Sequence, residues 1–400
     1  MAGNFGGIRI VSQSLAYSLA GVTVDSLCEV FVGGDPPLRN ALACPVDFFS
    51  EGAFVVEHHN IDTQPMNNVR KRTRERKLFG WVMLMLMLIS VGGYLGCSTK
   101  MPGRSFSGEI PEITETQIFV QEELRRVVTT LAVEHINRHT GNPEKLDGAA
   151  NYVQSEFEDL GYAVTRQSYE VNGVVCHNLI AEIKGIDEIM ILGAHYDAVP
   201  NCPAANDNGS GVAALIAMAR HFAGKTPGKT IRFVAFTNEE PPHFRQPSMG
   251  SLIYAKHCRA NDDNIVAMFS LETMGYYSEE KNSQNYPPVI GWLYPSTGDF
   301  VGIVGNKKSR ALARETVRLF REHAKFPSEG AALPDAIEGV GFSDHWSFWK
   351  YDYPGLMITD TAYFRYAHYH LPSDTPDKLN FPHFARVVDG LQDVFFELAK

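Results

Sequence analysis

The stretch EIMILGAHYDAVP, residues 188–200, indicates the fold most directly. Its first part is an apolar run, which is typical of a strand buried on both faces of a sheet. Its second part places His195 and Asp197 where the chain leaves that strand. Ligands of open α/β sheets bind at the carboxyl ends of the strands, so we expect functional side chains at this point.

Further strand and helix patterns alternate on both sides of this stretch. Strand-like runs occupy 162–171, 177–185, 230–238 and 265–273, and apolar residues recur at helical spacing over 122–139, 143–162 and 209–224. A last helix follows residue 380. This alternation predicts an α/β fold with a mixed, mostly parallel β-sheet sandwiched by helices.

Polar residues that suit a metal follow the predicted strands in order. After His195 come Asp207 before a glycine-rich helix entry, Glu239 and Glu240 after the strand at 230–238, Glu272 in an apolar context, and His368 and His370 near the C-terminus. Each alone has an ordinary explanation, such as a helix cap, a solvated loop or a surface histidine. Together, nitrogen and oxygen donors without a thiolate are typical of a hydrolytic zinc site.

The spacing also suggests different roles for neighbouring acids. Asp197, two residues after His195, can hydrogen-bond the second ring nitrogen and fix the tautomer of the imidazole. Of the adjacent Glu239 and Glu240, one can bind metal while the other acts as a general base on an attacking water molecule. Carboxylate bridging favours two metal ions rather than one.

At these residues the sequence resembles the M28 family of zinc exopeptidases, from about Ile118 to the C-terminus. The resemblance rests on HxD, DxxSG, an EE pair, a further acid and a His before a DT motif, matched by His195/Asp197, Asp207–Gly211, Glu239/Glu240, Glu272 and His370. It implies a zinc-exopeptidase fold of the phosphorylase/hydrolase-like type. It also implies two zinc ions, peptide substrates and hydrolysis of a terminal peptide bond by metal-activated water.

The resemblance further implies a role for each residue. His195 and Glu272 would hold one zinc, Glu240 and His370 the other, and Asp207 would bridge them. Glu239 would be the general base, and Asp197 would orient His195. The run GFSDHWSFW looks like the family's SDH segment, so Asp344 and His345 would line the pocket or support the ligands. Aromatic residues are expected in the pocket wall: Tyr276, Tyr277, Trp346, Tyr363 and Tyr366.

Glu272 departs from the family pattern, in which many members have aspartate, and this leaves the choice between one and two zincs open. The end of the peptide that is attacked is also open, because the fold includes carboxypeptidases, although an aminopeptidase is favoured. Two other functions remain as alternatives. One is a single-zinc glutaminyl cyclase, and the other is a binding ectodomain without catalytic activity.

Residues 78–96 carry no charge and form an apolar run of about the length that crosses a membrane. A block of basic residues precedes it at 70–77, which by the positive-inside bias keeps the N-terminus cytoplasmic. We therefore predict a transmembrane anchor at 78–97, with an extracytoplasmic domain after it. Because this run ends in LGC, acylation of Cys97 as a lipoprotein is an alternative.

These patterns divide the chain into four parts. Residues 1–77 form a cytoplasmic extension or result from a misassigned start site, 78–97 are the anchor, 98–117 a linker and 118–400 the peptidase domain. The formal net charge of −10 argues against nucleic acid as a partner. Six cysteines without a CxxC pair indicate neither a zinc knot nor a disulfide framework, although Cys176 could pair with Cys202 or Cys258. Oligomeric state is not predicted.

Overall fold

The computed structural model describes residues 66–288 and 290–400. Within this part, the side chains of residues 66–74, 88, 91, 94, 95 and 97 are not described. Most of the extension predicted at residues 1–77 therefore lies outside the described residues. The side chain of Cys97, whose acylation is the alternative to the anchor, is also not described. Within the described part, helices and strands alternate from residue 115 onward, as predicted.

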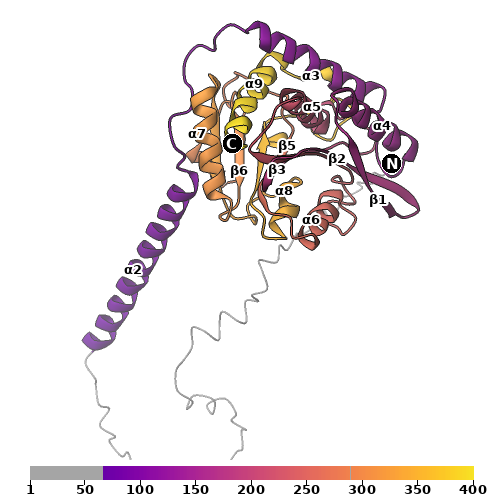
Figure 1. Cartoon of the computed structure of the whole chain (residues 1–400). Helices are drawn as coiled ribbons and strands as arrows, with labels where there is room; N and C mark the ends of the chain where they lie inside the picture. Colours follow the sequence, from indigo (N-terminus) through magenta and orange to yellow (C-terminus); the bar gives the residue numbers. More distant parts are fainter. Residues whose placement is uncertain (1–65, 289) are drawn as a thin grey trace, which may run out of the picture. The chain divides into compact units, whose positions relative to one another are not determined.

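One mixed sheet organises the chain beyond residue 160 (Figure 1). Its strands are β1 Val164–Val171, β2 Val174–Ile183, β3 Ile186–His195, β4 Lys229–Phe236, β5 Ile265–Glu272, β6 Val301–Gly305, β7 Ser328–Ala332 and β8 Gly355–Thr359. Their order is β1-β2-β4-β3-β5-β8-β6-β7. The central neighbours β4, β3, β5 and β8 run parallel. The predicted mixed, mostly parallel sheet is confirmed.

Helices cover both faces of this sheet. One side carries α3 Glu115–Val133, α4 Pro143–Asp159, α5 Gly211–Phe222, α7 Arg310–His323 and α9 Phe381–Leu398, and the other carries α6 Gly250–Ala260 and the short α8 His345–Trp349. Alternate residues of β3 enter different cores, since Met190 and Leu192 pack with the first group and Ile189 and Ile191 with the second. This burial on both faces explains the unbroken apolar run.

The parallel strands bring distant residues to one edge of the sheet. His195 ends β3 beside Phe236, the last residue of β4. Glu272 ends β5, which pairs with β3 on its other side. Because parallel strands present their carboxyl ends together, the residues that follow β3, β4, β5 and β8 meet at this edge.

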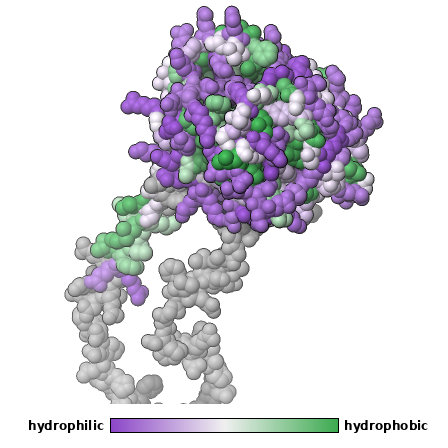
Figure 2. Space-filling view, in the orientation of Figure 1, coloured by the Kyte–Doolittle hydropathy of each residue, from purple (hydrophilic) through white to green (hydrophobic). Residues whose placement is uncertain are grey.

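The predicted anchor lies in α2, Met66–Thr99, whose described side chains include exposed apolar residues from Leu78 to Ile89. Figure 2 shows hydrophobic residues along this helix. Among the residues that the structure describes, no helix is both long enough and apolar enough to be a membrane span. The transmembrane segment predicted at 78–97 is therefore not supported by the structure.

The segment predicted as a linker makes specific contacts. The backbone carbonyls of Lys100 and Pro102 accept hydrogen bonds from Arg314 and Arg321 of α7, and Met101 is buried. Cys176, Cys202 and Cys258 are all free and buried, so the disulfide considered from the sequence does not form.

Candidate metal centre

Two groups of three side chains at the carboxyl edge could each hold a metal ion. His195, Asp207 and Glu272 form the first group, and Asp207, Glu240 and His370 form the second. Within each group, one candidate ligand atom per residue lies within 4.8 Å of the others. Asp207 belongs to both groups. The structure thus brings together all five residues that the sequence singles out as metal ligands.

The two groups lie on opposite sides of the Asp207 carboxylate. In the first, His195 Nε2 lies 3.4 Å from Asp207 Oδ1 and 3.4 Å from Glu272 Oε2. In the second, His370 Nε2 lies 2.9 Å from Asp207 Oδ2 and 3.2 Å from Glu240 Oε2. Each oxygen of Asp207 therefore faces a different histidine, as a carboxylate that bridges two ions would.

Burial and missing hydrogen bonds show that these residues fit a cation. Asp207, Glu240 and Glu272 are all at most 5% exposed, and burying several carboxylates together is costly without positive charge. Asp207 Oδ2, Glu240 Oε1 and His370 Nε2 are buried without a well-directed hydrogen bond. Nitrogen and oxygen donors in this number are the ligands of catalytic zinc sites. The residues present fit Zn²⁺.

The ionisation of the centre reflects its excess of negative charge. Burial, with the Asp207 carboxylate beside it, raises the pKa of Glu240 to about 7. Burial lowers the pKa of His370, but the Asp207 and Glu240 carboxylates close to its Nε2 outweigh this effect and raise the pKa to about 11. Both shifts favour protonation, which makes the Glu240 side chain neutral and the His370 side chain positively charged. A divalent cation would supply the same positive charge.

Glu239 and Asp197 lie beside the two groups. The carboxylate of Glu239 is 3.8 Å from His195 Nε2, belongs to neither group, and is buried, so its pKa is raised well above the usual value. Asp197 Oδ1 lies 3.4 Å from His195 Nδ1, next to the ring nitrogen that the sequence pairs it with, but this nitrogen has no well-directed hydrogen bond. Its two oxygens also accept the backbone N–H groups of Glu239 and Glu240, both at 3.1 Å. Asp197 therefore holds the Glu pair in position as well.

The SDH segment lies behind Glu272 rather than in a pocket wall. Ser343 Oγ donates to Glu272 Oε2 at 2.6 Å. Asp344 is fully buried with no hydrogen bond to either carboxylate oxygen, and burial raises its pKa to about 7. His345 Nε2 lies 2.9 Å from the Val340 carbonyl, and burial lowers the pKa of this histidine to about 4. Ser343 was not among the residues singled out from the sequence.

Asp374 supports the bridging residue through the backbone. Its carboxylate accepts the N–H groups of Asn206 and Asp207 at 2.9 and 3.1 Å. It also accepts the hydroxyl of Tyr366 at 2.8 Å. Tyr366, which the sequence suggested as a pocket or supporting residue, is thus buried and acts on Asp207 through Asp374.

Replacing Asp374 with asparagine is expected to weaken zinc binding about 10- to 100-fold, the usual effect of losing an outer hydrogen bond to a ligand. The amide nitrogen of asparagine would face a backbone N–H group, so one of the two bonds is lost. Competition with a chromophoric chelator measures the affinity. Asp377→Asn, an exposed change in the same turn, is the matched control and should bind zinc as the parent does. Equal affinity in both variants would contradict this role.

Two further buried polar residues shape the loops of the centre. Asn208 donates from its side-chain nitrogen to Leu271 O, and its Oδ1 accepts the N–H groups of Gly211 and Thr273, which joins the start of α5 to the end of β5. The buried guanidinium of Arg138 donates to four backbone carbonyls, those of Leu131, Tyr196, Pro203 and Ala204. Neither residue stands out in the sequence.

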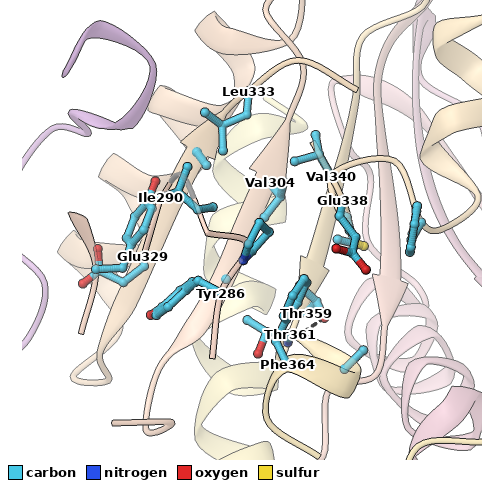
Figure 3. Close-up of a pocket in the computed structure, with 18 of the residues that line it drawn as sticks. Tyr286, Ile290, Val304, Glu329, Leu333, Glu338, Val340, Thr359, Thr361 and Phe364 are labelled. Carbon is cyan, nitrogen blue, oxygen red and sulfur yellow. Dashed lines mark hydrogen bonds between the residues drawn. The ribbon is translucent and has the colours of Figure 1, made fainter. Parts of the chain in front are cut away.

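A pocket opens beside the first group (Figure 3). Glu272 and Tyr369 form part of its lining, so the pocket adjoins the candidate metal centre. The ring of Tyr369 stacks on His370 with 3.8 Å between the ring centres. Of the five aromatic residues expected in a pocket wall, Tyr363 lines this pocket.

A family profile and curated relatives match this chain. The profile of Peptidase family M28 matches residues 178–394, which include all five candidate ligands. The uncharacterized protein YfbL of Escherichia coli (strain K12) is 36% identical over 280 residues, which cover 68% of this chain and 86% of YfbL. Aminopeptidase YwaD of Bacillus subtilis (strain 168) is 38% identical over 100 residues, 25% of this chain and 21% of YwaD.

A solved structure shares the fold. The zinc aminopeptidase BSAP from Bacillus subtilis superposes with a TM-score of 0.57 at 15% identity and covers 73% of this chain and 97% of its own. The match extends over almost the whole of that enzyme. The sheet and its helices therefore have the same fold as that enzyme.

Proposed function

This chain belongs to peptidase family M28, and on that premise we propose that it is a zinc-dependent aminopeptidase with two metal ions. The observation that carries the proposal is the pair of three-residue groups that share the Asp207 carboxylate. A single bridging acid between two histidine-containing groups suits a two-metal hydrolase, in which both ions act on one reacting bond.

Five residues would hold the zinc ions: His195 and Glu272 on one side, Glu240 and His370 on the other, and Asp207 between them. Zinc, when bound, polarises the scissile carbonyl and lowers the pKa of a bound water molecule to near 7. Glu272 keeps its place through the hydrogen bond from Ser343. The longer glutamate therefore suits this position, although many relatives have aspartate here.

Glu239 would move the proton. It is held through its backbone by Asp197 and lies beside His195 without belonging to a metal group. In the proposed reaction it takes a proton from the attacking water and passes it to the nitrogen of the leaving amine. Its buried position beside the first metal group, without membership of either group, suits both halves of this transfer.

The charge of the centre favours a substrate with a free α-amine. Asp197, Asp207, Glu239, Glu240 and Glu272 converge there, and their five negative charges exceed by one the four positive charges of two zinc ions, so the loaded centre still attracts a cation. A panel of peptides with free and N-acetylated first residues tests this. We expect release of the first residue only from the free peptides, abolished by a zinc chelator. Cleavage from the carboxyl end would refute the aminopeptidase proposal.

The same panel separates the two rival functions. A glutaminyl cyclase would convert N-terminal glutamine to a cyclic product of lower mass without hydrolysing other residues. A binding ectodomain would leave every peptide unchanged. Five competent ligand side chains brought within reach of one another support an enzyme over a binding module.

We also propose that the domain is extracytoplasmic and anchored through 78–97, which the sequence supports by its basic block and apolar run. Fractionation with protease protection tests this. A protein recovered wholly in the soluble cytoplasmic fraction would refute it.

A further inference from the structure

The pocket beside the metal centre has apolar walls built from the outer strands of the sheet. Alternate residues of β6 and β8 face it, including Val304 and Met357, while their neighbours Ile303 and Ile358 enter the core on the other side. Loop residues complete it: in Figure 3 Tyr286 and Ile290 lie across from Val340 and Glu338. Such walls suit a long, unbranched hydrocarbon chain.

The charged residues of the pocket are all acidic. Its lining includes Glu272, Glu329 and Glu338 but no lysine, arginine or histidine. Glu272 belongs to the first metal group, and Glu329 Oε2 lies 3.7 Å from Arg321 Nη2. Glu338 is exposed and forms no ion pair with any residue that the structure describes. One carboxylate of the pocket is therefore left for a ligand.

A second polar group of the lining lies near Glu338. The hydroxyl of Tyr363 is buried without a well-directed hydrogen bond. Burial and the nearby Glu338 carboxylate together raise the pKa of this hydroxyl, so it stays protonated near neutral pH and able to donate. The Tyr363 hydroxyl and the Glu338 carboxylate thus interact with each other on one side of a mostly apolar pocket.

We propose that this pocket binds the side chain of the substrate's N-terminal residue and selects lysine and arginine, with Glu338 as the residue that recognises their charge. This inference rests on the proposed aminopeptidase function. The methylene stem of such a side chain would pack on the apolar walls while its cation stays near solvent at Glu338. An N-terminal aspartate or glutamate would meet the Glu338 carboxylate, which has no cation beside it, and would be repelled.

Norleucine separates charge from stem length, because it matches the lysine side chain without the ammonium group. The experiment measures kcat/KM for lysyl, norleucyl and glutamyl p-nitroanilides with the full chain and with Glu338→Gln. We expect lysine to be preferred over norleucine in the parent. The variant should lose about fivefold on lysine, the upper range for an exposed ion pair, and nothing on norleucine. Asp335→Asn, an exposed acid outside the lining, is the matched control and should match the parent.

Each outcome bears on the inference. Unchanged norleucine hydrolysis by Glu338→Gln shows that the variant is folded and its metal centre intact. A parent that prefers norleucine, or an equal loss on lysine in both variants, would overturn selection by Glu338 while leaving the aminopeptidase proposal standing. If the parent hydrolyses none of the three substrates, selection of lysine is refuted, and the panel of free and N-acetylated peptides decides whether the aminopeptidase proposal fails as well.

Discussion

Replacing Glu239 with glutamine is expected to lower kcat about 10²- to 10⁴-fold, the usual contribution of a positioned general base, while zinc content stays unchanged. The amide has nearly the same shape, so the N–H···O bonds from the backbone to Asp197 should remain. It cannot accept the proton of the attacking water. Steady-state kinetics combined with metal analysis by mass spectrometry measure both quantities on the same sample.

Glu240→Gln is the matched control for this prediction, because it makes the same chemical change one residue away. Glu240 belongs to the second metal group, so this variant should lose metal along with activity. The contrast between the two variants tests the division of roles in the Glu pair. Equal metal loss in both, or full activity in Glu239→Gln, would contradict that division.

Replacing Asp207 with alanine is expected to have the largest effect on metal binding, because its carboxylate is common to both groups. Zinc content should fall from about two ions per chain to below one, and hydrolysis should disappear with it. The substitution removes a buried carboxylate whose neighbours are also acidic. The protein should therefore remain folded, which circular dichroism and thermal unfolding would check.

Glu272→Ala provides the comparison for Asp207→Ala, since it removes a ligand from the first group alone. We expect this variant to keep close to one zinc, held by Asp207, Glu240 and His370. If both variants kept one zinc each, the shared role of Asp207 would be refuted. If Glu272→Ala kept two, glutamate at this position would not be a ligand.

The sheet and the ligand set could be predicted because one physical rule connects them. Buried strands are recognisable as apolar runs, and the residue after each run lies at the carboxyl edge if the strands are parallel. His195 and Glu272 end strands that pair in the structure, as that rule requires. This rule does not predict the position of His370, because His370 lies in a long loop after β8. Only its place before the DT motif indicates it as a ligand.

The supporting contacts could not be predicted, because they join loops that are far apart in sequence. Asp374 reaches Asp207 through backbone N–H groups, and no local pattern reveals which backbone a side chain will contact. Arg138 looks like an ordinary surface arginine in the sequence, yet its guanidinium is fully buried among carbonyls. Ser343 could have been suspected, since it precedes the SDH aspartate and histidine directly.

The pocket wall was only partly foreseen for the same reason. Tyr363 was expected in the wall and lines the pocket, whereas Tyr366 instead donates to Asp374. Part of the wall comes from β6, β7 and β8, whose five residues each carry a weak pattern, and most of it comes from loops that are far apart in sequence. The sequence does not indicate a role for Glu338, because that role depends on the absence of a cationic side chain among the residues that line the pocket.

A two-metal centre can be tested by the zinc content of the purified protein, followed by chelator titration of its hydrolysis of free-amine peptides. We expect close to two zinc ions per chain and activity that is lost as zinc is removed and regained when zinc is returned. A protein that releases N-terminal residues while holding one zinc or none would contradict the two-metal centre bridged by Asp207.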